Sequence, residues 1–271
     1  MNLIETSSWE DFQEKLHDVQ HEEDAKEHSS QFLFRGTGDS AWVLETTLER
    51  AGRDGERISD YYNLIIALKS QVETYSMHRW EIAESPEIEK AADKIEAWSS
   101  HKFPTPEIYS YMVYLRHHGF PSPLLDWSRS PYVAAFFAFR SVVRPRDDKV
   151  SIFAFSEMPE WSHVYGSFSP WIRRIGHHVR AHRRHFLQQS DYTMCEIFEH
   201  GPGRFANHES VFSRNNKKQD VLWKFNIPWG ERTKVLTQLD AYNLNAYSLF
   251  ESEESLMETL AFRTLQAGRL S

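Results

Sequence analysis

The side chains best suited to ligand chemistry begin at Arg35. It follows four largely apolar residues and precedes Gly36, so the sequence predicts a strand that ends at Arg35 and enters a loop. A guanidinium is a rigid, permanently charged fork that binds phosphate or carboxylate, and glycine allows backbone to approach a ligand closely. Thr37 and Asp39 can add hydrogen bonds. The segment is therefore either an anion-binding site or an arginine that pairs with Asp39 or Asp126 to hold a loop in place.

A second candidate is Asp126, which follows two leucines and lies between prolines. We expect its carboxylate to be partly buried, and a buried carboxylate must be hydrogen-bonded or paired. Arg35 is an attractive partner for it. Such a pair serves either as a structural latch or as the centre of a site, because perturbed charges occur in both, and both interpretations stay open.

A third candidate is a basic segment. The chain has no acidic residue between Glu160 and Asp191, and the spacing of apolar residues predicts a helix from Pro170 to about Leu187. One face of this helix carries basic side chains: Arg173, His177, Arg180 and Arg184. The three arginines suit the phosphates of a nucleic acid, although a solvated surface helix is the commoner outcome for such a pattern.

The sequence offers little support for a metal site or for the common nucleotide-binding and serine-hydrolase motifs. His178, His182 and His185 have spacings that metal sites use, but neither a glutamate of the metallohydrolase kind nor a cysteine pair accompanies them, so no metal is expected. The Walker-type phosphate loop, the Gly-x-Gly-x-x-Gly turn and the Gly-x-Ser-x-Gly motif are absent. These absences argue against P-loop enzymes, common dehydrogenases and serine hydrolases of the common fold.

The composition bounds the class of protein. Of 271 residues, 40% are apolar and 14% aromatic, which is enough to build a sizeable core. The single Cys195 cannot form an internal disulfide, no secretory leader is recognisable, and the longest apolar run, 132–139, is too short to cross a bilayer. We therefore expect a cytoplasmic protein without membrane contact. The net charge of −8 disfavours nucleic-acid binding over the whole surface but is compatible with a local basic patch.

The elements that must position these groups follow from periodicity and end signals. Strands are predicted at 31–34, 124–127, 150–155, 222–228 and 246–247. Helices are predicted after a capping box at Ser7 and Glu10, within 58–102, at 108–117 with a stop at Gly119, from Ser130 onward, and at 170–187, 231–242 and 252–265. They indicate a single α+β domain, 1–271, with a central mixed or split β-sheet flanked by helices and a helical insertion after the first strand. Its parts are an N-terminal helix with a polar lead-in (1–30), the helical segment (58–118) and a C-terminal strand-helix portion (222–271).

Three motifs resemble the FRG domain family, which is found in bacteria and phages and is named for a Phe/Tyr-Arg-Gly sequence. Phe34-Arg35-Gly36 reproduces this sequence, and Leu124-Leu125-Asp126-Trp127-Ser128 is similar to the end of a second signature, Leu-Leu-Asp-Trp-Thr. The whole signature corresponds to residues 115–128, and within it Arg116 replaces the usual glutamine and Ser122 the usual threonine. The third signature is similar to Arg184, Gln188, Tyr192 and Thr193, and the resemblance spans about residues 5–265.

A more distant similarity is to ADP-ribosyltransferases, which bind NAD in a split sheet. On this resemblance Arg35 holds the pyrophosphate, Ser128 orients the nicotinamide ribose, and Gln188 or Glu209 takes the third position. Departure of nicotinamide leaves an oxocarbenium-like sugar that a carboxylate stabilises better than glutamine does, so Glu209 or Asp126 would supply the charge. The expected ligand-binding residues are Gly36, Thr37, Trp127, Arg184 and Tyr192.

Three functions are compatible with these residues. The leading interpretation is a protein that binds NAD or a related nucleotide, with ADP-ribosyl transfer or NAD cleavage as its reaction. The alternatives are a non-catalytic module that binds phosphates or nucleic acid, and a protein-interaction domain in a bacterial defence or toxin system. The leading interpretation requires Arg35 and Asp126 to meet in one accessible cavity.

Overall fold

The computed structural model describes residues 1–24, 30–82, 104–157, 169–176, 179, 181, 183–198, 202–212 and 220–268. Its strands are β1 (Asn2–Glu5), β2 (Leu33–Thr37), β3 (Leu125–Ser128), β4 (Lys149–Ser156), β5 (Trp171–Arg174), β6 (Ser190–Ile197), β7 (Arg204–Phe205) and β8 (Val221–Pro228). Its helices are α1 (Trp9–Asp24), α2 (Thr47–Arg50), α3 (Ile58–Ser76), α6 (Pro106–His117), α7 (Pro131–Phe139), α8 (Arg183–Leu187), α9 (His208–Phe212), α10 (Arg232–Ala241), α11 (Ala246–Phe250) and α12 (Glu253–Ala261). Short helical turns, η2 (Trp229–Glu231) and η3 (Phe262–Gln266), precede α10 and follow α12.

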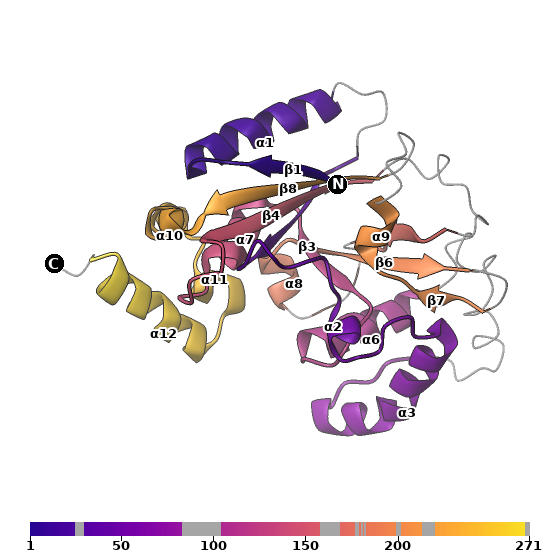
Figure 1. Ribbon diagram of the computed structural model, residues 1–271. Coiled ribbons are helices and arrows are strands. Elements are labelled where there is room, and N and C mark those ends of the chain that lie inside the picture. Colours follow the sequence, from indigo (N-terminus) through magenta and orange to yellow (C-terminus); the bar gives the residue numbers. More distant parts are fainter. Residues whose placement is uncertain are drawn as a thin grey trace.

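The strands of the described ranges form one open, mixed sheet of eight strands (Figure 1). Their order is β1-β8-β4-β2-β3-β6-β5, with β7 paired to β6. β1 runs parallel to β8, whereas the other neighbours are antiparallel. This arrangement confirms the predicted α+β fold with a central mixed sheet flanked by helices. The helical insertion of α3 and α6 follows the strand predicted at 31–34, as expected; this strand is β2 because the sequence pattern does not predict β1.

Helices α1, α7 and α10 cover one face of the sheet. Their apolar side chains pack with alternate residues of β4, such as Val150 and Ile152, in one buried cluster. The intervening residues Phe153 and Phe155 pack on the opposite face. β4 is therefore buried on both sides, as expected for the central strand predicted at 150–155. Helices α3 and α6 form a third cluster with side chains of β6.

Helix α7 begins where the sequence predicts and presses closely on β2. The Ser130 hydroxyl accepts a hydrogen bond from the backbone N–H of Val133 (3.4 Å), and Pro131 occupies the first turn, where its missing N–H leaves no hydrogen bond unmade. A Cβ added to Gly36 would lie 1.9 Å from the carbonyl oxygen of Ala134 on α7. The glycine is therefore needed for the packing of the helix on the strand.

Two predicted elements are wrong, and one helix cap is shifted. Residues 171–174 form β5, paired with β6, so only Arg183–Leu187 of the predicted helix 170–187 is helical among the described residues. The predicted strand 246–247 belongs to α11, whose first turn is capped by the side chain of Asn245. The capping hydroxyl of α1 is that of Ser8, which accepts from the N–H of Asp11, rather than that of Ser7.

Part of the predicted helical segment 58–118, residues 83–103, lies outside the described residues. Within the ranges that the structure does describe, no helix is both long enough and apolar enough to cross a membrane.

Candidate functional site

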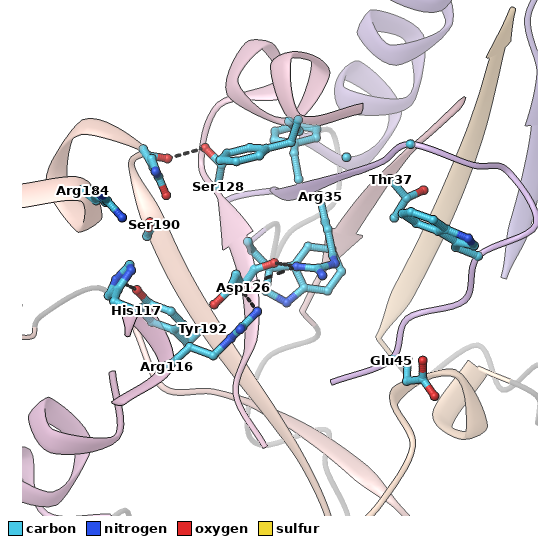
Figure 2. Close-up of a pocket in the computed structure, with 18 of the residues that line it drawn as sticks. Arg35, Thr37, Glu45, Arg116, His117, Asp126, Ser128, Arg184, Ser190 and Tyr192 are labelled. Atoms are coloured by element: carbon cyan, nitrogen blue, oxygen red, sulfur yellow. Dashed lines mark hydrogen bonds and ion pairs between the residues drawn. The ribbon is translucent and has the colours of Figure 1, made fainter. Parts of the chain in front are cut away.

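A cavity of about 660 Å³ lies where β2 and β3 diverge (Figure 2). These two strands share the single residue pair Phe34 and Ser128, whereas β2 pairs with β4 over five positions and β3 with β6 over four. The sheet is therefore split beyond this pair, and residues of both strands line the space between them. The volume falls in the range of about 300–1,000 Å³ that is usual for small-molecule sites.

The guanidinium of Arg35 lies in the split. Arg35 occupies the middle of β2 rather than its end, which corrects the position predicted from the sequence. Its Nη1 donates a hydrogen bond to the backbone oxygen of Asp126 (2.6 Å) and lies 4.0 Å from the carboxylate of the same residue. Burial lowers the pKa of Arg35 to about 10 against the attraction of Asp126, and repulsion by Arg116 and Arg50 adds to the decrease. The guanidinium remains charged at neutral pH.

The closest partner of the Asp126 carboxylate is Arg116. Nη2 of Arg116, in the last turn of α6, donates to Oδ2 of Asp126. The Asp126 side chain is 36% exposed, which agrees with the partial burial expected from its flanking residues. Asp39, the other partner predicted for Arg35, instead accepts a hydrogen bond from the N–H of Ala41 (2.8 Å). Arg35 and Asp126 therefore share the cavity as a loose ion pair, and Arg116 holds the carboxylate.

The lining carries more positive than negative charge. Among the described residues, its charged side chains are four arginines and two carboxylates: Arg35, Arg50, Arg116 and Arg184, with Glu45 and Asp126. Each carboxylate has an arginine neighbour, since Glu45 lies 4.0 Å from Arg50 and Asp126 contacts Arg116. The surplus of two positive charges favours an anionic ligand.

Ser128 and Gln188 line the cavity and connect its walls. The Ser128 hydroxyl donates to the backbone oxygen of Gln188 (2.8 Å) and accepts from the N–H of Ser130 (3.1 Å). The side-chain amide of Gln188 donates to the backbone oxygen of Leu249 (3.1 Å), which connects α8 to α11. Both polar groups therefore already hold structural hydrogen bonds at the cavity wall.

The predicted ligand-binding residues all line the cavity: Gly36, Thr37, Trp127, Arg184 and Tyr192. Trp127 is only 3% exposed, and its indole N–H donates to the hydroxyl of Thr193 (2.8 Å), so most of its ring belongs to the core. Arg184 donates a hydrogen bond to the backbone oxygen of Phe250 (3.3 Å). The guanidinium carbon of Arg184 lies 5.4 Å from the centre of the phenyl ring of Phe250. Burial raises the pKa of Tyr192 far above its usual value, so its hydroxyl stays protonated.

Glu209 is not brought to the cavity. It lies on α9, where its carboxylate accepts a hydrogen bond from the backbone N–H of Leu44 (2.9 Å), and it is not one of the lining residues. Glu209 thereby anchors the loop that leads to the lining residue Glu45. Of the two carboxylates predicted from the sequence to stabilise a sugar cation, Asp126 is the one in the cavity.

The described residues of the predicted basic helix do not form one continuous helix. Arg173 lies on β5, where its guanidinium is 3.5 Å from the fully buried carboxylate of Glu196. Arg180, together with His177, His178 and His182, lies outside the described residues. Of the three arginines, Arg184 lines the cavity. The helical surface on which nucleic-acid binding was predicted is therefore absent from the described part of the chain.

We expect Glu196 to make the stability of the fold depend on pH. Burial raises its pKa from 4.5 to about 7, against the attraction of Arg173. The pKa of this carboxyl group is higher in the folded state than in the unfolded state. Its contribution to the free energy of unfolding is therefore fully present below the unfolded pKa and is lost as the pH rises through about 7. Glu196→Gln leaves Arg173 beside a neutral amide, which lowers the free energy of unfolding at every pH, but between about pH 5 and 8 the difference from the wild type should shift in the variant's favour by up to about 3 kcal/mol. Urea denaturation measures this difference, and a difference independent of pH would contradict the expectation.

Several lining residues were not assigned to the site from the sequence: Glu45, Arg50, His117, Phe137 and Phe250. His117 lies between Arg116 and Ser122 of the second family signature, which is a signal that places it near the site. Phe250 ends α11, and only the packing of this helix against α8 brings it to the cavity.

Residues 30–147 match the family model described as the FRG domain, which confirms the resemblance over this range. The range contains Arg35, Arg116, Asp126 and Ser128, whereas Tyr192 and the other lining residues of α8, β6 and α11 lie beyond it. No curated protein and no solved structure is significantly similar to the chain.

Proposed function

Since residues 30–147 form an FRG domain, we propose that the chain binds NAD or a related phosphorylated nucleotide around Arg35, with ADP-ribosyl transfer or NAD cleavage as its reaction. The observation that carries this proposal is the arginine surplus, because the described residues of the lining include four arginines and two carboxylates. The surplus charge equals that of a pyrophosphate bridge, and guanidinium groups bind phosphate oxygens through paired hydrogen bonds.

Aromatic side chains in the lining support a ligand that also carries planar rings. Trp42 is 58% exposed at the edge of the cavity, and Phe250 lies beside Arg184. The ammonium group of Lys224 donates to the backbone oxygens of Ser40 (2.7 Å) and Trp42 (3.2 Å), so the loop that carries the indole is held in place. Nucleobases and nicotinamide stack on such rings.

The geometry also supports a reaction at the ribose. Arg35 and Arg116 would hold the pyrophosphate, while the half-exposed carboxylate of Asp126 would stabilise the positive charge that develops on the sugar as nicotinamide departs. The contact with Arg116 holds the Asp126 carboxylate in the cavity, where this role requires it.

The proposal predicts selective stabilisation by phosphorylated ligands. NAD or ADP-ribose at about 100 times its Kd should add about 2.7 kcal/mol to the free energy of unfolding, which raises Tm by roughly 5–10 °C. Adenosine and nicotinamide, which lack the phosphates, should produce little shift at the same concentration. Differential scanning fluorimetry measures the shift, and chromatography measures nicotinamide release from NAD.

The outcomes separate the two main interpretations. A shift with nicotinamide release supports the enzyme. A shift without release supports the non-catalytic phosphate-binding module. Equal shifts with adenosine and ADP-ribose would exclude a role for the arginines in recognition.

A further inference from the structure

A tyrosine hydroxyl between two histidines lies beside the arginines of the cavity. His117, the last residue of α6, lines the cavity together with Tyr192 of β6 (Figure 2). The Tyr192 hydroxyl lies 2.8 Å from Nε2 of His117 and 3.3 Å from Nδ1 of His185 on α8. The ring of His185 stacks on that of Tyr192 with 12° between the planes, and the ring of His117 stands at 86° to it. Three elements therefore converge on one hydroxyl.

The three groups form a hydrogen-bonded chain that orients the His117 ring. A protonated tyrosine hydroxyl donates one hydrogen bond, so it donates to one histidine and accepts from the other. When Nε2 of His117 is the donor, its Nδ1 carries a lone pair and can accept a proton. The imidazolium that results keeps its hydrogen bond to Tyr192, which in turn donates to His185. Within the described ranges, the charged side chains of the lining that share this part of the cavity are Arg116 on α6, Asp126 on β3 and Arg184 on α8.

We propose that His117 accepts the proton of the attacking hydroxyl group, with Tyr192 and His185 as positioning residues. The inference rests on the proposed function. The bond between the ribose C1′ and nicotinamide breaks, and nicotinamide leaves with the electron pair. The oxygen of water, or of an acceptor alcohol, forms the new bond to C1′, and its proton passes to His117 and then to solvent.

The test is nicotinamide release from NAD between about pH 5 and 9. His117→Gln keeps a hydrogen-bonding side chain but cannot take up the proton, so release should fall about 10²- to 10⁴-fold and lose its decline at acid pH. The Tm shift with ADP-ribose should be retained, because the four arginines are unchanged. The matched control is His118→Gln, an exposed neighbour outside the lining, which should behave as the wild type does.

A second variant keeps the proposal testable if His117→Gln does not fold. Tyr192→Phe preserves the ring and removes the hydroxyl, so it should move the acid limb of the pH profile while ADP-ribose still raises Tm. A purely structural role would lower stability without moving that limb.

The possible failures are distinguishable. If His117→Gln and Tyr192→Phe bind ADP-ribose and release nicotinamide with the wild-type rate and pH profile, this inference is wrong and the proposed function stands. If the wild type binds ADP-ribose but releases no nicotinamide, the reaction and this inference are both excluded while ligand binding remains. If the wild type does not bind ADP-ribose, the proposed function itself is overturned.

Discussion

Replacing Gly36 with alanine is expected to destabilise the fold by about 3 kcal/mol or more. The new Cβ would lie 1.9 Å from the carbonyl oxygen of Ala134 and 2.7 Å from the backbone nitrogen of Ala138. Both atoms belong to the backbone of α7, so relief of the overlap requires the whole helix to move away from β2. Urea denaturation followed by circular dichroism measures the loss.

Gly38 supplies a matched control on the same segment. A Cβ added there would have its nearest neighbour, the carbonyl oxygen of Ala138, at 3.8 Å, which is an ordinary contact. Gly38→Ala should therefore change the free energy of unfolding by less than about 1 kcal/mol. Similar losses in the two variants would show that the contact with α7 is not the reason for glycine at position 36.

This expected difference assigns separate tasks to neighbouring residues of the Phe-Arg-Gly motif. Phe34 packs in the core cluster beneath α7, and Gly36 lets that helix contact the strand. Arg35, between them, faces the split between β2 and β3 and reaches the backbone oxygen of Asp126. The packing of α7 on β2 therefore positions the guanidinium in the cavity.

Local sequence signals predicted the elements that have a regular pattern of buried residues or a clear end signal. Residues 150–155 alternate between two buried faces, and Ser130 with Pro131 provides an unambiguous helix start. β5 could not be predicted in the same way, because an arginine in a short strand becomes favourable only when a distant carboxylate meets it. Arg173 finds that partner in Glu196 on β6, a contact between strands that helical periodicity cannot reveal.

The sequence predicted which types of charged residue form the candidate site, but not which of these side chains contact one another. Residue types and their predicted burial were enough to expect Arg35 and Asp126 in one cavity. The role of Arg116 depends on how the last turn of α6 packs beside β3, and local sequence does not encode that packing. Glu209 is similar in type to Asp126, yet a hydrogen bond from the backbone N–H of Leu44 holds its carboxylate outside the lining of the cavity.

The substitution Asp126→Asn distinguishes the two roles that the sequence leaves open for this carboxylate. It removes a negative charge from the lining, so the arginine surplus grows and ADP-ribose should bind about three- to tenfold more tightly, roughly 1 kcal/mol. If Asp126 also stabilises the sugar cation, nicotinamide release should fall about 10²- to 10³-fold at the same time. Tighter binding with slower release is the combined result expected of a catalytic carboxylate.

Glu45→Gln provides the control, because it removes the other carboxylate of the lining, which lies 4.0 Å from Arg50. It should tighten ADP-ribose binding to a similar extent without the loss of nicotinamide release. Isothermal titration calorimetry and a release assay measure the two quantities on the same samples. If Asp126→Asn lowers stability but leaves the release rate at the wild-type value, Asp126 is a latch that holds Arg116 and Arg35 across the split. The charge that stabilises the sugar would then have to come from elsewhere in the cavity.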